Sequence, residues 1–221
     1  TVNGETVANG TQNVHNGGSA VSTTINGGGW QRIFSGGSAT STTVNSGGYQ
    51  YVNNGGSATG TTVNSGGYQN VDNGGSATST TVNSGGRQYV HNGGSATSTT
   101  VNSGGYQSVY EGGSATGITQ SAGAALVVDM TSATVVSGNY VSGGNSSAFS
   151  VSGGKAENLV LENGGALYVS NGTSAVSTTV NSGGLQSVYE GGSATSTVVS
   201  NAGVMMVLGS DSRTTVSSGG V

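Results

Sequence analysis

A unit of 19 residues recurs along most of this chain, and this period constrains the fold more than any other feature of the sequence. Residues 36–54 read GGSATSTTVNSGGYQYVNN, and residues 55–73 repeat them as GGSATGTTVNSGGYQNVDN. Residues 74–92 and 93–111 continue in the same register. A period of about 20 residues is typical of stacked repeat proteins, in which each unit buries its apolar face only against its neighbours. We therefore expect one elongated array.

The units follow one another without a linker or a change of composition. Regular units occupy residues 17–35, 36–54, 55–73, 74–92, 93–111, 112–130, 153–171, 172–190 and 191–209. Residues 131–152 form a longer unit of 22 residues, where we expect an irregular coil. Because partial units stand at both ends, we interpret residues 1–221 as a single β-helix segment of a longer protein.

Each unit contains two glycine-rich turns and two runs that favour strands. In the second complete unit the turns are residues 36–37 and 45–48, and the β-prone runs are residues 39–44 and 49–53. Glycine and asparagine tolerate positive φ, whereas threonine, valine and tyrosine favour strands. Short strands and turns at a fixed period predict an all-β fold, a right-handed parallel β-helix (solenoid) with about 19 residues per coil. Successive coils would then lie about 4.8 Å apart.

The internal copies allow the inward positions to be identified column by column. Alternation along a strand places Thr42 on the same side as Val44, and Gln50 on the same side as Val52. Three columns hold valine, isoleucine or alanine in nearly every copy and are expected to form the core: Val44, Val63, Val82, Val101 and Val180; Val14, Ile33, Val52, Val71, Val90, Val109, Val128, Val169 and Val188; Ala20, Ala39, Ala58, Ala77, Ala96, Ala115 and Ala194.

Atypical units support this assignment. The Thr42 position becomes Ile118 and Leu159 in two of them, and the Gln50 position becomes Leu126 and Leu167. Gln120, which takes the Val44 position, is the one exception that the pattern leaves unexplained.

Three further columns vary between copies and are expected to face outward: Trp30, Tyr49, Tyr68, Arg87, Tyr106 and Leu185; Arg32, Tyr51, Asn70, Tyr89 and Ser108; His15, Phe34, Asn53, Asp72, His91, Tyr110 and Tyr189. A turn column repeats asparagine, whose side-chain amides are expected to hydrogen-bond from coil to coil: Asn45, Asn64, Asn83, Asn102 and Asn181.

Charge and motif content argue against several functions. Four basic residues are scattered among eight acidic ones, so no basic stripe is available to nucleic acid. The chain shows no apolar run of the roughly 20 residues that a membrane helix needs. Glu111 and Glu190, like His15 and His91, share a column but lie several coils apart, so the pattern indicates no enzyme and no catalytic residue. No metal site and no cofactor are expected, because the GGSAT motif lacks the aspartate of calcium-binding nonapeptide repeats.

An ice-binding β-solenoid is one alternative. Thr-x-Thr steps recur at residues 40–42, 59–61, 78–80 and 97–99, and matched threonine rows on an outer face could order water. The column assignment opposes this alternative, because it turns Thr42 inward. Rows of outward hydroxyls and tyrosines suit weak contacts that add up over many coils, and they also offer attachment points for sugars.

The motif GGSATSTTVNSGGYQYVNN resembles the 19-residue repeats of AIDA-type autotransporter adhesins of Gram-negative bacteria, and residues 148–165 resemble the antigen 43 kind. The resemblance implies an exported passenger domain at the bacterial surface that mediates host-cell adhesion, autoaggregation and biofilm formation. It implies contacts with a second copy or a host receptor, and glycosylation by a transferase of the producing cell. It also implies a distortion of the rod in the 22-residue unit, expected as a bulge near residues 137–147.

Carried over by motif, the candidate O-glycosylation sites are the GGSA serines Ser19, Ser38, Ser57, Ser76, Ser95, Ser114 and Ser193, and the NSGG serines Ser46, Ser65, Ser84, Ser103 and Ser182. The outward ladders provide the candidate face for adhesion and self-association: Ser41, Thr43, Thr62, Ser79, Thr81, Ser98, Thr100, Tyr49, Tyr68 and Tyr106. A structural stalk that carries glycans and binds nothing itself is the alternative function.

Overall fold

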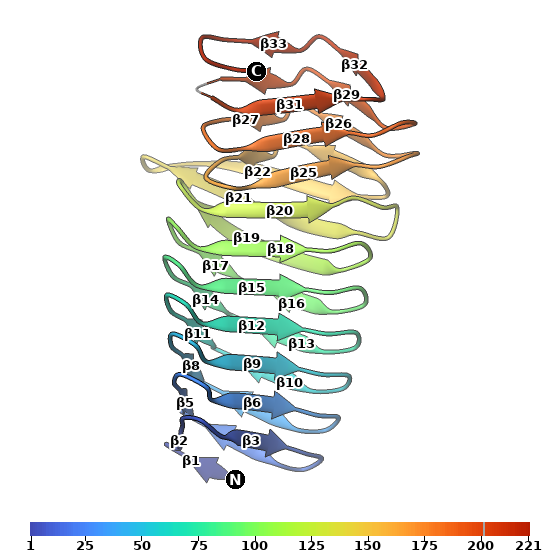
Figure 1. Ribbon diagram of the computed structural model, residues 1–221. Coiled ribbons are helices and arrows are strands. Elements are labelled where there is room, and N and C mark those ends of the chain that lie inside the picture. Colours follow the sequence, from blue (N-terminus) through green and yellow to red (C-terminus); the bar gives the residue numbers. More distant parts are fainter. Residues whose placement is uncertain (201) are drawn as a thin grey trace.

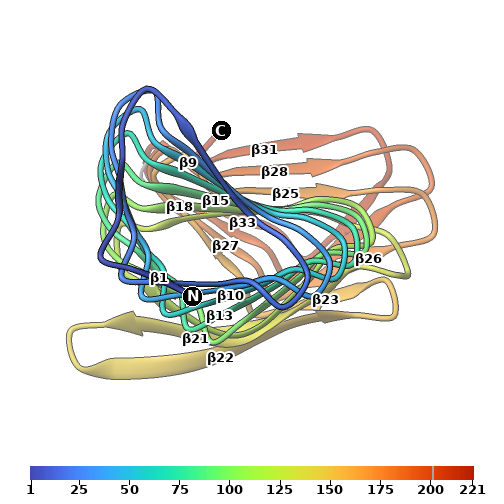
Figure 2. The ribbon, with the colours of Figure 1, turned by 90° about the horizontal axis from the view of Figure 1, so that it is seen from below.

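The computed structural model describes residues 1–200 and 202–221 and shows a parallel β-helix, with the termini at opposite ends of a rod (Figure 1). The nearer strands run from left to right in Figure 1, and the chain returns behind them at the next level, so the coil is right-handed. Seen along its axis, a regular coil has three strand-bearing faces (Figure 2). None of the described residues forms a helix that could cross a membrane.

We number the faces in the order in which each coil visits them. The first face consists of β1 (Val2–Asn3), β4 (Ser19–Val21), β7 (Ser38–Thr40), β10 (Ser57–Thr59), β13 (Ser76–Thr78), β16 (Ser95–Thr97), β19 (Ser114–Ser121), β21 (Val135–Ser142), β22 (Asn145–Ser152), β23 (Lys155–Glu157), β26 (Ser174–Val176), β29 (Ser193–Thr195) and β32 (Ser210–Ser212).

The second face has shorter strands. These are β2 (Thr6–Val7), β5 (Thr24–Ile25), β8 (Thr43–Val44), β11 (Thr62–Val63), β14 (Thr81–Val82), β17 (Thr100–Val101), β24 (Val160–Leu161), β27 (Thr179–Val180), β30 (Val198–Val199) and β33 (Thr215–Val216).

The third face is a continuous sheet of ten strands. It comprises β3 (Thr11–Val14), β6 (Trp30–Ile33), β9 (Tyr49–Val52), β12 (Tyr68–Val71), β15 (Arg87–Val90), β18 (Tyr106–Val109), β20 (Ala125–Asp129), β25 (Ala166–Val169), β28 (Leu185–Val188) and β31 (Val204–Val207).

The expected strand over residues 39–44 is divided in two, because Ser41 has a φ of 56°. This left-handed residue turns the chain from the first face to the second, and it also resets the alternation of side chains. Ala39 and Thr42, three residues apart, therefore both point inward and are each 1% exposed. Serine takes this strained conformation in several coils, whereas Gly60 and Gly117 adopt it without a Cβ.

The inward columns predicted from the repeats are confirmed. Val44 and Val52 are fully buried, and Thr42 lies beside them. Ser108 was expected to face outward with Tyr89, and this was wrong in part: its small side chain is only 1% exposed, beside the larger Tyr106 and Tyr110.

A ladder of buried glutamines runs through the core beside the valines. Gln12 Nε2 donates to the Glu5 carboxylate, and each later amide nitrogen Nε2 donates to the Oε1 atom of the glutamine one coil earlier, at 2.7 Å from Gln50 to Gln31 and 2.7 Å from Gln69 to Gln50. The Thr61 hydroxyl also donates to Gln50, at 3.0 Å. Because a buried amide without partners is costly, this ladder requires the coils that it joins to keep the same register. The six members are Gln12, Gln31, Gln50, Gln69, Gln88 and Gln107.

The 22-residue unit contains an antiparallel hairpin. Strands β21 and β22 pair from Val136↔Val151 to Ser142↔Asn145, and the hairpin projects from the rod (Figure 2). Strand β22 is an additional strand on the first face, because β23 pairs with it in antiparallel orientation before parallel stacking resumes. The irregular segment expected near residues 137–147 lies within this hairpin.

Strand register slips by two residues across the hairpin on the third face. β20 pairs with β25 so that Val128 lies beside Leu167, whereas the repeat columns matched Val128 with Val169. The column assignment was therefore wrong across this break, although it holds on either side of it. Figure 2 shows the corresponding sideways displacement of the coils that follow the hairpin.

The break also explains Gln120. Its Nε2 atom donates to the backbone oxygens of Ala124 and Val160, both at 3.1 Å. A valine at position 120 could not donate to either oxygen. Val160 lies on β24, which follows the irregular unit and is the first strand of its sheet.

We predict that Gln69→Glu destabilises the rod far more than Gln69→Leu at pH 7. A glutamate can still accept from Thr80 and Gln88, but it cannot donate to Gln50 and would bury a charge without a counter-ion, which costs about 3 kcal/mol or more. Burial raises the pKa of such a carboxyl, so the stability of Gln69→Glu is lost as pH rises through the folded-state pKa and recovers below it. Denaturation midpoints at pH 7 and pH 4 measure this, and a Gln69→Glu midpoint equal to that of Gln69→Leu at pH 7 would contradict the ladder.

Candidate adhesion surface

The outer side of the third face carries a row of stacked aromatic rings, which we call the aromatic ladder. Parallel strands in register place equivalent side chains about 4.8 Å apart, close to the distance at which rings stack. The centroid distance is 4.9 Å from Trp30 to Tyr49 and 5.0 Å from Tyr49 to Tyr68. The full ladder comprises Trp30, Tyr49, Tyr51, Tyr68, Tyr89, Tyr106 and Tyr110.

The ladder changes column as it climbs. Tyr68 stacks on Tyr89 at 6.4 Å, because Arg87 occupies the position directly beside Tyr68. Tyr89 then contacts Tyr106 and Tyr110, at 5.9 and 6.2 Å. Since most rings cover one another's faces, their edges and hydroxyls are what the ladder offers to a partner. Burial is the main cause that raises the pKa of Tyr51, Tyr106 and Tyr110 above the ordinary value of a phenol.

Two arginines lie over rings of this ladder. The Arg32 guanidinium carbon is 5.2 Å from the ring centroid of Trp30, and that of Arg87 is 5.5 Å from Tyr106. Arg87 Nη1 also donates to the Tyr89 hydroxyl at 3.4 Å, and this contact is the main cause that raises the pKa of Arg87. The third face therefore combines aromatic and cationic groups.

The ten candidate face residues do not share one face. Thr43, Thr62, Thr81 and Thr100 are half-buried on the second face, whereas Tyr49, Tyr68 and Tyr106 are on the third. Ser41, Ser79 and Ser98 occupy the left-handed corner between the first and second faces and are exposed. The prediction of a single face was wrong because it ignored the turns that separate these columns.

The two sets of candidate glycosylation serines differ in exposure. The GGSA serines, such as Ser57, begin the first-face strands and are half-buried. The NSGG serines, such as Ser65, lie in the turn between the second and third faces and are exposed. Half-buried members are Ser19, Ser38, Ser57, Ser76, Ser95, Ser114 and Ser193, and exposed members are Ser46, Ser65, Ser84, Ser103 and Ser182. The asparagine ladder predicted in the same turns is confirmed, with Asn64 Nδ2 donating to Asn45 Oδ1 at 2.9 Å.

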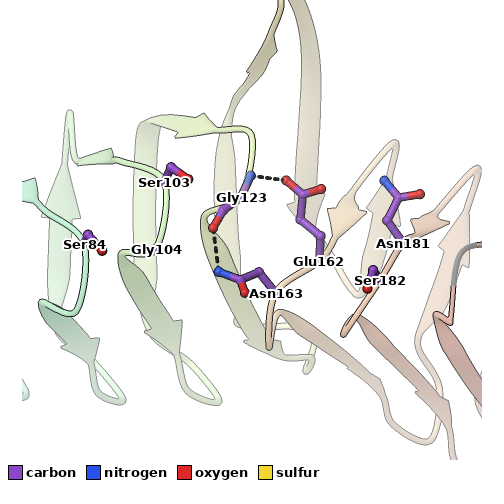
Figure 3. Close-up of a pocket in the computed structure, with 8 residues that line it drawn as sticks. All are labelled: Ser84, Ser103, Gly104, Gly123, Glu162, Asn163, Asn181 and Ser182. Carbon is purple, nitrogen blue, oxygen red and sulfur yellow. Dashed lines mark hydrogen bonds between the residues drawn. The ribbon is translucent and has the colours of Figure 1, made fainter.

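An open hollow of about 590 Å³ marks the place where the turn column is interrupted (Figure 3). In regular coils the turn glycines bond through their backbones, as from Gly104 N to Gly123 O at 2.8 Å. Gly123 N instead donates to Glu162 Oε1 at 2.6 Å, and Asn163 Nδ2 donates to Gly123 O at 2.7 Å (Figure 3). The Tyr140 hydroxyl reaches the same carboxylate oxygen at 3.1 Å.

Sequence reasoning missed this role of Glu162, although a signal was present. Residues 162–165 read ENGG where regular units read NSGG, so a carboxylate replaces the ladder asparagine beside the irregular unit. It missed a second feature as well: Glu111 and Asp129, from consecutive coils, line one hollow with Tyr168 and Tyr189.

Comparison with known proteins agrees with the fold. A family model described as AIDA, an adhesin of the bacterial autotransporter system and probable stalk, matches residues 26–67, 64–105 and 142–203. Among solved structures, the chain is similar to the TibC-catalysed, hyper-glycosylated TibA55-350 fragment, with 42% sequence identity and a TM-score of 0.64. The match covers 99% of this chain and 88% of that chain. No curated protein matches the chain.

We predict that Glu162→Ala lowers the free energy of unfolding by about 1–2 kcal/mol, because Gly123 N loses a charged acceptor at a partly exposed site. Glu157→Ala is the matched control, since Glu157 forms an exposed ion pair with Lys155 on the surface. Thermal unfolding of both variants measures the difference. An equal effect of the two substitutions would contradict the bridging role of Glu162.

Proposed function

Because the chain belongs to the AIDA family of bacterial autotransporter adhesins, we propose that its aromatic ladder mediates cell adhesion and bacterial self-association. The chain is part of an adhesin passenger domain, and such a domain is exported to the cell surface. The finer assignment, to adhesion through the third face, rests on the geometry of that face.

The extended row of aromatic edges is the observation that carries this proposal. Tyrosine and tryptophan give large contact areas at a low cost in conformational entropy, and they are enriched in protein interfaces. The row extends from Trp30 on β6 to Tyr110 after β18, so a partner of matching periodicity can make many weak contacts at once. A second copy of the rod has such periodicity, and autoaggregation and biofilm formation would follow from pairing between cells. A host receptor is the other partner that this surface would serve.

The low charge of the chain also favours self-association. Charged residues make up 5% of the chain, and its net charge is −4 at pH 7. Two copies therefore repel each other only weakly at physiological ionic strength, where exposed charges are screened beyond about 8 Å. We assign no enzymatic activity to this surface.

We expect Tyr49→Ser, Tyr68→Ser and Tyr106→Ser, combined in one variant, to weaken self-association at least about tenfold, which corresponds to about 1.4 kcal/mol. The matched control is Thr43→Ala, Thr62→Ala and Thr100→Ala on the second face, which should associate as the native chain does. Sedimentation of the unglycosylated fragment over a range of concentrations measures both, and clumping of bacteria that display the variants tests the cellular effect. If the tyrosine variant is folded and self-associates as strongly as the native chain, the proposal is wrong.

A structural stalk is the second candidate function, and the description of the matching family as a probable stalk favours it. The regular hydrogen-bonded coils suit a rigid spacer. Two results together would support the stalk. The purified fragment would remain monomeric at all concentrations, and bacteria that display the tyrosine variant would clump as well as bacteria that display the threonine variant.

Glycosylation by a transferase of the producing cell is the further part of this proposal. The similar TibA fragment is described as hyper-glycosylated by TibC, and the present rod offers two serine ladders at the coil spacing. The exposed NSGG serines have the more accessible hydroxyls.

We expect Ser65→Ala, Ser84→Ala and Ser103→Ala together to remove more glycan mass than Ser57→Ala, Ser76→Ala and Ser95→Ala, when the chain is co-produced with a transferase of the TibC kind. Intact-protein mass spectrometry counts the sugars lost. Equal losses, or a greater loss from the half-buried set, would reject the preference for turn serines.

A further inference from the structure

A hollow of about 310 Å³ lies at the edge of the third face, where β20 and β25 pair with the two-residue slip. Without the slip, Asp129 would stand beside the residue two positions after Tyr168; with it, Asp129 pairs with Tyr168. The hollow is lined by Glu111, Asp129, Tyr168, Ser170 and Tyr189. These residues lie in or just after four successive strands of the third face, β18, β20, β25 and β28, and the slip places Asp129 directly beside Tyr168.

One wall of the hollow is aromatic. The Tyr168 and Tyr189 rings stack with their centroids 6.4 Å apart and their planes 17° from parallel. Tyr189 is 44% exposed, so part of its surface is open to a ligand. An aromatic surface attracts cations through the negative potential of its π faces, particularly where water is partly excluded.

Two carboxylates that pair with no cation in the described part of the chain, those of Glu111 and Asp129, also line the hollow. Within the described residues, the ion pairs are His91–Asp72 and Lys155–Glu157, and neither involves Glu111 or Asp129. Burial, and secondly the charge of Glu111, raise the pKa of the Asp129 carboxyl. A bound cation would offset this repulsion between like charges.

The same sheet shows which cation suits such a wall. On the third face, Arg32 lies over Trp30 and Arg87 over Tyr106, both with the guanidinium within 5.5 Å of a ring centroid. A guanidinium is planar, stacks on aromatic rings and donates to carboxylates through a fixed fork of N–H groups. A compact ammonium matches the carboxylates but not the flat wall.

We propose that this hollow binds the guanidinium group of an arginine side chain presented by a partner protein, with Glu111 and Asp129 accepting its hydrogen bonds and Tyr168 and Tyr189 flanking it. This goes beyond adhesion through the aromatic ladder, because it identifies a discrete site and the residue type that it selects. It would give a multivalent surface one contact with side-chain specificity.

The site is tested by titrating the whole 221-residue chain with arginine amide at constant ionic strength. Two-dimensional NMR spectra recorded at each step monitor the binding. We expect saturable binding with a Kd on the order of 1 mM, centred on residues 110–111, 129, 168–170 and 189. Asp129→Asn and Glu111→Gln should each weaken it at least fivefold, as should Tyr168→Leu. Glu157→Gln, a carboxylate change elsewhere on the surface, should leave it unchanged.

Three results would overturn the proposal. They are the absence of saturable shifts, equal binding of choline and arginine amide, and binding of Ca²⁺ at these residues in preference to arginine amide. Asp129→Asn removes the repulsion between the carboxylates of Glu111 and Asp129 without changing the shape of the side chain. Its NMR spectrum should therefore show a folded chain, so that a loss of binding cannot be attributed to unfolding. Because free arginine amide is the probe, the outcome does not depend on whether the rod self-associates.

Discussion

Hydrogen bonding of each coil to the coils before and after it is the constraint on which the whole structure depends. Few large apolar side chains are available, so the core combines valine and alanine with polar groups that must find partners. Gln50, Gln69 and Thr61 find them only when equivalent residues lie one above another. The same register that satisfies the buried amides stacks the rings of Tyr49 and Tyr68 outside. Core stability and surface periodicity therefore have one cause.

Repeat columns were sufficient to predict the parallel β-helix, the inward sides of Thr42 and Gln50 and the asparagine ladder, because these features depend only on which residues recur. They were insufficient where the backbone changes direction. The positive φ of Ser41 separates two faces, although serine itself does not require that conformation. The slip at Val128 and Leu167 follows from the β21–β22 hairpin, whose pairing joins residues within a unit that has no copy. Glu162 and the pair Glu111–Asp129 acquire their roles only through that break.

The irregular unit thus determines where the rod has individual sites. Regular coils offer the same groups repeatedly, which suits weak contacts summed along a face. At the break, Glu162 replaces a missing backbone acceptor on one edge of the third face. On the other edge, tyrosines and carboxylates from the two sides of the slip line one hollow. A passenger domain built in this way combines a periodic surface, for which we propose adhesion, with a local hollow of different composition.

Paired-cysteine crosslinking tests the central claim, the register slip, most directly, because the chain contains no native cysteine. The structure places Val127 beside Ala166, whereas the repeat columns place it beside Tyr168. Neighbouring Cα atoms on adjacent strands lie within the roughly 4.4–6.8 Å that a disulfide spans, and a two-residue offset exceeds it. The account predicts that Val127→Cys with Ala166→Cys oxidises readily to an intramolecular disulfide and that Val127→Cys with Tyr168→Cys does not. The reverse result would contradict the slip and the sites derived from it.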